Sequence, residues 1–341
     1  MSLTAAALRR VAVVIQATAA GALAAYLALG AGWPWPPAIT FGVVAVLTGF
    51  GISVAIAFAT TLGGLGVPRS TRPPLPANTP PRAPLGLPKA VACFLFECQS
   101  VFRMFNWLQP FRSRLTFAQP ARALPDVPHV LLVHGYGCNH AVWLDMAPAL
   151  TAAGYRCEGI DLEPVLGDID DYAPALLARM REITSRTGRP PLLVCHSMGG
   201  LAARAAQVLA AKAGEPPACT GIVTLGSPHH GCALARFGGG RNARQMRWFS
   251  PWLTALAAAE SPALRARIVS VFSWHDSIAG PPGTSWLDGA RHVALDGIGH
   301  VSLLRHPGAT NATLAALAIL HSTSADLPSA GARQAPAARF M

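Results

Sequence analysis

Two long uncharged apolar runs near the start of the chain constrain its fold most. Residues 11–29 form a run of 19 residues without a charge, and residues 38–62 form a second run of 25. At a helical rise of 1.5 Å per residue, each run is long enough to cross a hydrocarbon core of about 30 Å. We therefore predict a membrane anchor over residues 1–66, made of two transmembrane helices. For the first run a cleaved signal peptide is the alternative, with Arg9 and Arg10 as its basic start.

The residues that flank these runs predict how the hairpin sits in a membrane. The connector at 30–37, GAGWPWPP, has no charge, and Trp33 and Trp35 suit the headgroup level, where aromatic side chains gather. Basic residues precede the first run and follow the second, and these are Arg9, Arg10, Arg69, Arg72, Arg82 and Lys89. By the positive-inside rule both outer ends face the cytoplasm. The bilayer is thus a predicted partner, and a periplasmic domain follows instead if the first run is cleaved.

Composition supports this division of the chain. Hydrophobic residues make up 52% and charged residues 13%, against about 25% charged residues in ordinary soluble domains. Residues 1–127 hold 10 basic and 2 acidic side chains, so they carry +8 of the net charge of +11. Because these arginines flank apolar or Pro-rich sequence, we predict no nucleic-acid partner. Seven cysteines without C-x-x-C spacing indicate neither a disulfide framework nor a zinc cluster.

Residues 67–127 are predicted to join the anchor to the rest of the chain. A Pro-rich stretch with scattered arginines at 67–88 is typical of an extended linker. The stretch 89–110 that follows is rich in Phe and Trp and has few charges. It predicts either a helix lying on the bilayer surface or a helix packed on the following domain. Both interpretations remain open at this point.

From residue 129 onward, apolar runs alternate with helix-like stretches, which predicts an α/β fold with a mostly parallel sheet over residues 128–321. The short tail at 322–341 is rich in Ala, Ser and Pro and is predicted to be disordered. The predicted strands cover 129–133, 155–161, 191–195 and 267–273, and the predicted helices cover 142–153, 169–187 and 198–211.

A nucleophile elbow is predicted between the strand at 191–195 and the helix at 198–211. The stretch CHSMGG at 195–200 places Ser197 at a sharp strand-to-helix turn between small residues, which would project its hydroxyl. The usual pattern is G-x-S-x-G, and Cys195 replaces its first glycine. The alternative is that Ser197 only caps the helix.

The acid and the base are sought downstream, because hydrolases with such an elbow supply them in the order serine, acid, histidine. Asp276 follows the predicted strand 267–273 directly, at the edge of the sheet where sites form. His300 stands in the glycine-rich stretch GIGHVS at 297–302. The competing acids and histidines fit the pattern less well, and these are Asp288, Asp296, His292 and His306.

An oxyanion hole is predicted from two backbone N–H groups. The turn HGYG at 134–137 follows the first strong strand, so the N–H of Tyr136 is the expected first donor. The N–H of Met198, next to the nucleophile, is the expected second donor.

These segments together resemble the α/β-hydrolase lipases and esterases of bacteria over residues 129–320. The resemblance rests on LLVHGYG at 131–137, CHSMGGLAAR at 195–204, TLGSPHHG at 224–231, the turn at Asp276 and GIGHVSLL at 297–304. It implies a carboxylester hydrolase in which Ser197 attacks, His300 acts as base and then acid, and Asp276 orients the imidazole. Relatives with a structural calcium carry an Asp just after the histidine, where this chain has Val301 and Ser302. We therefore predict no metal, and no cofactor.

Residues 232–266 are predicted to cover the site. Their apolar cluster beside three arginines is typical of a lid that opens toward lipid, although an ordinary core helix is the alternative. With His134, the expected substrate-binding and lid residues are Met246, Trp248, Phe249, Trp252 and Leu253.

The sequence thus predicts an integral protein of a bacterial inner membrane with a cytoplasmic ester-hydrolase domain, acting on acyl lipids or other esters. A thioesterase, an amidase or an acyltransferase would use the same acyl-enzyme. A membrane scaffold that keeps the fold without the chemistry is the alternative of a different class.

Overall fold

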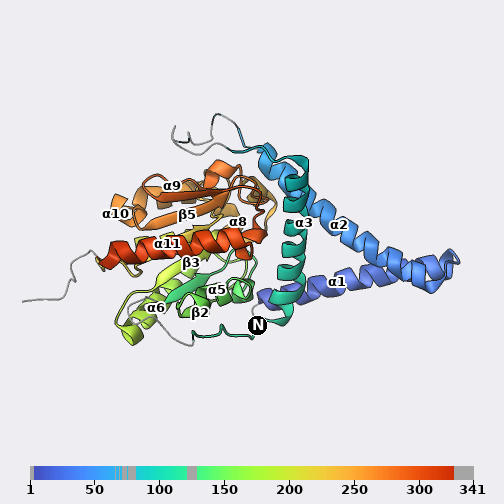
Figure 1. Ribbon diagram of the computed structural model, residues 1–341, viewed down its shortest axis with the longest axis horizontal. Helices are drawn as coiled ribbons and strands as arrows, with labels where there is room; N and C mark the ends of the chain where they lie inside the picture. The colour runs from blue at the N-terminus through green and yellow to red at the C-terminus, as the bar shows by residue number, and fades with distance from the viewer. Residues whose placement is uncertain are drawn as a thin grey trace, which may run out of the picture.

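The computed structural model describes residues 4–65, 67–68, 70, 75, 82–120 and 129–325 (Figure 1). Residues 69, 71–74 and 76–81 of the predicted linker, residues 121–128 and the predicted tail from residue 326 onward lie outside the described residues. The prediction of a disordered tail from residue 322 is wrong for residues 322–325, which belong to the last helix, ending at Ala325.

A single parallel sheet of six strands forms the centre of the larger part of the molecule. Its order is β2-β1-β3-β4-β5-β6, and every neighbouring pair is parallel. The predicted α/β fold is confirmed, and the sheet is parallel throughout instead of mostly parallel. The strands are β1 (Val130–Val133), β2 (Cys157–Ile160), β3 (Leu192–His196), β4 (Gly221–Leu225), β5 (Ile268–Ser273) and β6 (Arg291–Leu295).

Helices cover both faces of this sheet, as an all-parallel sheet requires. Leu131 and Val133 of β1 point to one face, which packs against α6 (Ile169–Thr187), α7 (Met198–Lys212) and α9 (Pro251–Ala259). Val130 and Leu132 point to the other face, which packs against α5 (Ala147–Ala152) and α11 (Pro307–Ala325). The shorter helices are α8 (Gly240–Gln245), α10 (Pro262–Arg265) and the 3-10 turns His140–Trp143, Ala233–Phe237, Pro282–Ser285 and Val301–Leu304.

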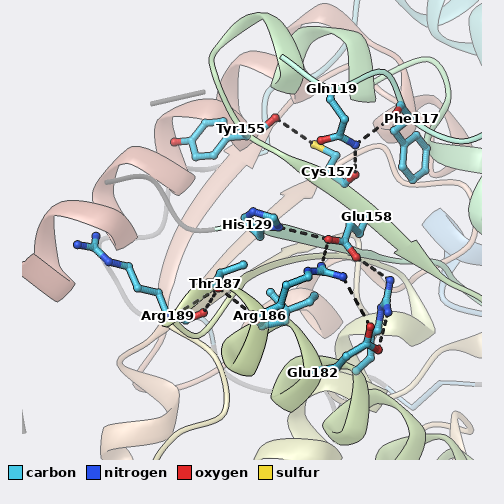
Figure 2. Close-up of polar contacts among 12 residues, drawn as sticks. Phe117, Gln119, His129, Tyr155, Cys157, Glu158, Glu182, Arg186, Thr187 and Arg189 are labelled. Atoms are coloured by element: carbon cyan, nitrogen blue, oxygen red, sulfur yellow. Dashed lines mark hydrogen bonds and ion pairs between the residues drawn. The ribbon is translucent and has the colours of Figure 1, made fainter. Parts of the chain in front are cut away.

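A charged cluster ties the outer edge of the sheet to α6 (Figure 2). Glu158 of the edge strand β2 accepts from Arg179 at 2.6 Å and also from Arg186, both on α6. His129 Nδ1 lies 3.3 Å from the same carboxylate. Charged side chains on an edge strand hinder pairing with another chain, so this cluster has a structural explanation.

The first two helices form a hairpin that extends away from the sheet (Figure 1). Helix α1 (Ala5–Ala25) continues into a π-helical turn (Tyr26–Gly30), and α2 (Trp35–Gly63) returns beside it. They pack closely, since a Cβ added at Gly42 would lie 2.4 Å from the carbonyl oxygen of Ala20. By length and composition alone, both helices are long and apolar enough to cross a membrane.

Helix α3 (Leu87–Arg103) runs from the end of α2 to the start of α1 and lies against the sheet domain (Figure 1). It continues into a π-helical turn (Met104–Leu108) and the short α4 (Gln109–Phe111). One face is buried at Cys93, Glu97, Ser100, Met104 and Leu108. Apolar side chains on the rest of its surface stay exposed, and these are Val91, Leu95, Phe102, Trp107 and Phe111. The segment thus packs on the domain and still presents an apolar surface.

Candidate active site

The strand order places a crevice at the carboxyl ends of β1 and β3. The chain passes from β1 outward to β2 and then back to β3 on the other side of β1, so the order reverses there. Ligands bind at such a reversal in open α/β sheets. The turn at Gly135 and Tyr136 follows β1, and Ser197 follows β3, so both predicted elements meet at this point.

Ser197 occupies a backbone conformation that is rare for a residue with a side chain. Its φ is 54° and its ψ is −124°, at the sharp turn between β3 and α7. A Cβ added at Gly199 would lie 2.6 Å from the carbonyl oxygens of Val133 and His134, so only glycine fits there. Cys195, at the position that departs from the usual pattern, is fully buried in the core. The elbow therefore forms with a cysteine in place of the first glycine.

Asp276 and His300 form a buried pair next to this turn. His300 Nδ1 donates to Asp276 Oδ2 at 2.8 Å, and both side chains are nearly inaccessible. The other carboxylate oxygen, Oδ1, accepts from the backbone N–H groups of Ile278 at 2.8 Å and Ala279 at 2.7 Å. The carboxylate is thus held at both oxygens, and Nε2 is the imidazole nitrogen left to face the cavity.

The two carboxylates near His300 decide its charge state. Burial would lower the pKa of His300, but the charge and hydrogen bond of Asp276, together with the charge of Glu97, outweigh it and raise the pKa. The pKa of the neighbouring His196, whose ring centroid is 4.5 Å from that of His300, shifts in the opposite direction. Burial, with the charge of His300, holds the pKa of His196 well below its ordinary value.

A cavity of about 150 Å³ joins the nucleophile to the histidine. Ser197 and His300 both line it, as do Gly135 and Tyr136 of the predicted oxyanion turn. The Tyr136 side chain points to the rim, where its hydroxyl donates to Gly239 O at 2.9 Å. Met198, the first residue of α7, is buried directly after Ser197. The other lining residues of the sheet domain are Cys138, Val142, His196, Ile278, Val301 and Leu304, and the N-terminal elements complete the wall.

The N-terminal elements, and not residues 232–266, supply the cover of this cavity in the structure. Arg9 of α1 and the π-helical residues Met104 and Phe105 line it. None of Met246, Trp248, Phe249, Trp252 and Leu253 is among its lining residues.

The residues expected in a lid have other partners. Met246 and Leu253 are buried in the core against α6 and α7. Trp252 Nε1 donates to Asp170 Oδ2 at 2.8 Å, which ties α9 to α6. Trp248 lines a separate cavity, and Phe249 is 43% exposed.

His134 is likewise held by the backbone on both sides of its ring. Its Nδ1 donates to Gly135 O at 2.9 Å, and its Nε2 accepts from Leu162 N at 2.9 Å. It does not line the cavity that holds Ser197. These hydrogen bonds indicate that His134 holds the turn after β1 in place and does not contact the substrate.

The competing candidates lie apart from the cavity. His292 stacks on Trp286 with ring centroids 3.6 Å apart, and Asp296 lies 3.6 Å from His275. Among the residues that the structure describes, no group of three or more His, Cys, Asp or Glu side chains could hold a metal ion.

Sequence reasoning missed three side chains that reach the site from outside residues 128–321. Glu97 of α3 is fully buried, and its carboxylate accepts from Ser277, Val301 and Ser302 around His300. Thr61 at the end of α2 donates to Ser277 O at 2.9 Å, and Arg9 of α1 lines the cavity. Glu97 carries a usable signal, because it is one of only two acidic residues among the first 127.

Comparisons with known proteins agree with this fold. A family model described as the alpha/beta hydrolase family matches residues 130–339, more than half of the chain. Lipase BlEst2 of Bacillus licheniformis in its mature form matches with a TM-score of 0.51 at 20% identity, over 61% of this chain and 97% of its own. Aspergillus fumigatus lipase B matches with a TM-score of 0.50 at 15% identity, over 59% of this chain and 55% of its own. At such identities the likeness to these structures shows the fold alone. No curated protein matches the chain.

Proposed function

The chain belongs to the alpha/beta hydrolase family, and from that premise we propose that it is a membrane-anchored serine hydrolase that cleaves carboxylic esters of acyl lipids. The observation that carries the proposal is the buried Asp276–His300 pair, which shares one cavity with a serine in a strained elbow. Strained backbone and a raised histidine pKa are both typical of catalytic sites.

In the proposed mechanism the Ser197 hydroxyl attacks the ester carbonyl while His300 Nε2 takes its proton. Asp276 holds the imidazole by Nδ1 and stabilises the imidazolium that forms. The backbone N–H groups of Tyr136 and Met198 receive the negative oxygen of the tetrahedral intermediate. His300 then protonates the leaving alcohol. In the second half His300 takes a proton from water, the hydroxide attacks the acyl carbonyl, and the C–O bond to Ser197 breaks as His300 returns the proton to Ser197 and the acid leaves.

The N-terminal elements support membrane anchoring. Apolar side chains along the hairpin are exposed, such as Val14 and Ile15 at 62% each and Ile56 at 59%. Burying such surface in a bilayer removes it from water. The exposed apolar side of α3 and the aromatic ring of Trp107 continue this surface beside the candidate site. An ester at the membrane surface would therefore meet the cavity directly, and the flanking arginines favour the cytoplasmic side of a bacterial inner membrane.

Contacts of α1 with the turn after β1 and with α4 favour retention of the first apolar run. Arg9 donates to Gly137 O at 3.1 Å, and Arg10 donates to Pro110 O at 2.7 Å. Removal of α1 as a signal peptide would leave both acceptors without these donors. Alkaline-phosphatase activity in the periplasm from a fusion placed after residue 130 would contradict the cytoplasmic orientation.

Labelling by a fluorophosphonate tests the mechanism. The detergent-solubilised protein should label covalently, and Ser197→Ala should abolish labelling because the probe reacts with an activated serine hydroxyl. Ser322→Ala, at an exposed position on α11, is the control and should label like wild type. A wild-type protein that does not label, or a Ser197→Ala protein that does, would refute the proposed nucleophile.

Hydrolysis of p-nitrophenyl esters of increasing acyl length tests the substrate class. A membrane lipid hydrolase should favour medium and long chains over acetyl. A strict preference for acetyl would contradict the lipid assignment while leaving the esterase assignment in place.

A further inference from the structure

Arg9 brings a positive charge into the cavity that holds Ser197. Its guanidinium lies 4.1 Å from the ring centroid of Phe105, and its Nη2 donates to Gly137 O at 3.1 Å. Gly137 belongs to the same turn as Gly135, whose added Cβ would touch Ser197 Cβ at 2.9 Å. Gly135 and Gly137 are at most about 7 Å apart, so the guanidinium and the nucleophile lie close together within one cavity.

This charge has no carboxylate partner among the residues that the structure describes. Neither Asp nor Glu lines the cavity, and no ion pair joins Arg9 to an acid. The Nε of Arg9 is buried and has no hydrogen-bond acceptor. Within the part of the chain that the structure describes, Arg9 makes one hydrogen bond, to Gly137 O, so four of its five N–H donors have no hydrogen-bond acceptor there. A cation held against an aromatic ring with free donors costs free energy unless an anion joins it.

We infer that Arg9 binds an anionic phosphate group of the substrate, so that the hydrolase acts on acyl esters of phosphate-bearing lipids. This inference rests on the proposed function, because it places the phosphate beside an ester that Ser197 attacks. The planar fork of an arginine suits a phosphate, whose oxygens accept two parallel hydrogen bonds. In an acyl glycerol phosphate the phosphate and the ester carbonyl are only a few bonds apart. This short separation fits the site, because the turn at Gly135 and Gly137 contacts both Ser197 and Arg9.

The position of Arg9 along α1 favours a lipid phosphate over a free one. The apolar run that we assign to the bilayer begins at Val11, two residues later. At 1.5 Å per residue, Arg9 lies about 3 Å outside the start of the hydrocarbon. That is the depth of lipid headgroups. The same cavity is also lined by the apolar side chains of Met104, Phe105 and Ile278, which suit the start of an acyl chain.

The test compares two esters that differ only in the phosphate, 1-hexanoylglycerol and its 3-phosphate. The full chain in nonionic detergent should show a kcat/KM at least about tenfold higher for the phosphate ester, the effect of one charge-assisted hydrogen bond or more. Arg9→Gln should bring this ratio close to one, and Arg9→Lys should keep part of it. Arg10→Gln is the matched control, because Arg10 has the same charge and helix but lies outside the cavity.

A ratio that is the same in Arg9→Gln and wild type would overturn the inference, even if both rates fall, since Arg9 would then only hold the turn at Gly137. Binding of hexyl phosphate to Ser197→Ala, measured by calorimetry, separates this from the reaction. Its Kd should rise at least about tenfold when Arg9→Gln is added.

Inorganic phosphate provides the last arm of the experiment. If it binds Ser197→Ala as tightly as hexyl phosphate, the site takes a free anion and the lipid assignment is wrong. If hexyl phosphate binding depends on Arg9 while wild type cleaves neither ester, the result supports Arg9 as an anion-binding residue and contradicts the proposed ester hydrolysis.

Discussion

Replacing Glu97 by glutamine should damage the catalytic centre from a helix outside the family match. In the structure Oε1 accepts from Ser277 Oγ at 2.5 Å and from Val301 N at 3.0 Å. Oε2 accepts from Ser302 N at 2.9 Å and from Ser302 Oγ at 2.6 Å. Ser277 Oγ in turn accepts from His300 N at 3.3 Å. One carboxylate thus holds the backbone directly after the proposed base and, through Ser277, the backbone N–H of the base itself.

The magnitude follows from the donors that the amide cannot serve. A glutamine has one acceptor oxygen, so its NH₂ group must face one of the two backbone N–H groups, at Val301 or Ser302. A buried N–H without an acceptor costs about 1–3 kcal/mol. The bonds that remain weaken by about 1 kcal/mol each because their acceptor is no longer charged. The total is about 3–5 kcal/mol, which lowers the melting temperature by roughly 10 °C in a domain of this size.

The pH dependence gives a second readout that lost packing alone would not move. The charge of Glu97 contributes to the raised pKa of His300. His300 must be neutral to take a proton, so kcat/KM falls as the pH drops through this pKa. Without the charge the pKa of His300 falls, and the acidic limb of the profile should move to lower pH. The remaining charge of Asp276 keeps the direction of the wild-type shift.

Thermal unfolding in detergent and pH–rate profiles with p-nitrophenyl butyrate measure both effects. Gln99→Ala is the control on the same helix, because Gln99 is exposed and its side-chain oxygen accepts from Arg305 at 3.1 Å instead of from the segment after His300. Glu97→Asp keeps the charge and should keep the acidic limb near its wild-type position. A Glu97→Gln protein with unchanged melting temperature, rate and acidic limb would refute the positioning role.

Three further predictions concern two glycines near the site and a buried ion pair in the sheet domain. Gly199→Ala places a Cβ 2.6 Å from two backbone carbonyl oxygens, so it should lower the free energy of unfolding by about 1–3 kcal/mol and reduce fluorophosphonate labelling. Gly280→Ala should lower the esterase rate because its Cβ would lie 2.2 Å from Thr61 Cγ2. Adding Thr61→Ser removes that methyl group and should restore the rate, and equal rates in both variants would contradict the contact. Arg204→Met breaks a buried two-bond pair with Glu260 and should cost about 3–5 kcal/mol in denaturant unfolding.

The sheet and the elbow could be predicted because their signals are local. The buried strand before Ser197 and the helix after it are each encoded in a short run of residues, and the structure places them at Leu192–His196 and Met198–Lys212. Asp276 and His300 could be proposed because chain order and strand ends restrict the choice. Their contact at 2.8 Å joins positions 24 residues apart, a geometry that neither segment encodes alone.

The cover of the cavity could not be predicted because its signal is not local. The aromatic cluster at 246–253 has the composition of a lid, but composition does not tell which surface an apolar side chain meets. Trp252 illustrates this, since its ring packs on the core and its N–H bonds to Asp170. Conversely, Arg9 directly precedes the first apolar run, which indicates only a role in membrane orientation. Nothing near it in the sequence indicates that it lines a cavity formed by residues more than 120 positions later.

The three N-terminal helices contact the loops of the proposed active site at three separate points. Arg9 of α1 contacts the turn after β1, Thr61 of α2 contacts the loop that follows Asp276, and Glu97 of α3 holds the segment after His300. A tether that served only to hold the domain near a membrane would need none of these contacts. Because each one fixes a backbone segment that the mechanism uses, a change in the packing of the hairpin must alter the geometry of the site. If α1 and α2 span a membrane as proposed, the proposed esterase activity should depend on the detergent or bilayer that surrounds them.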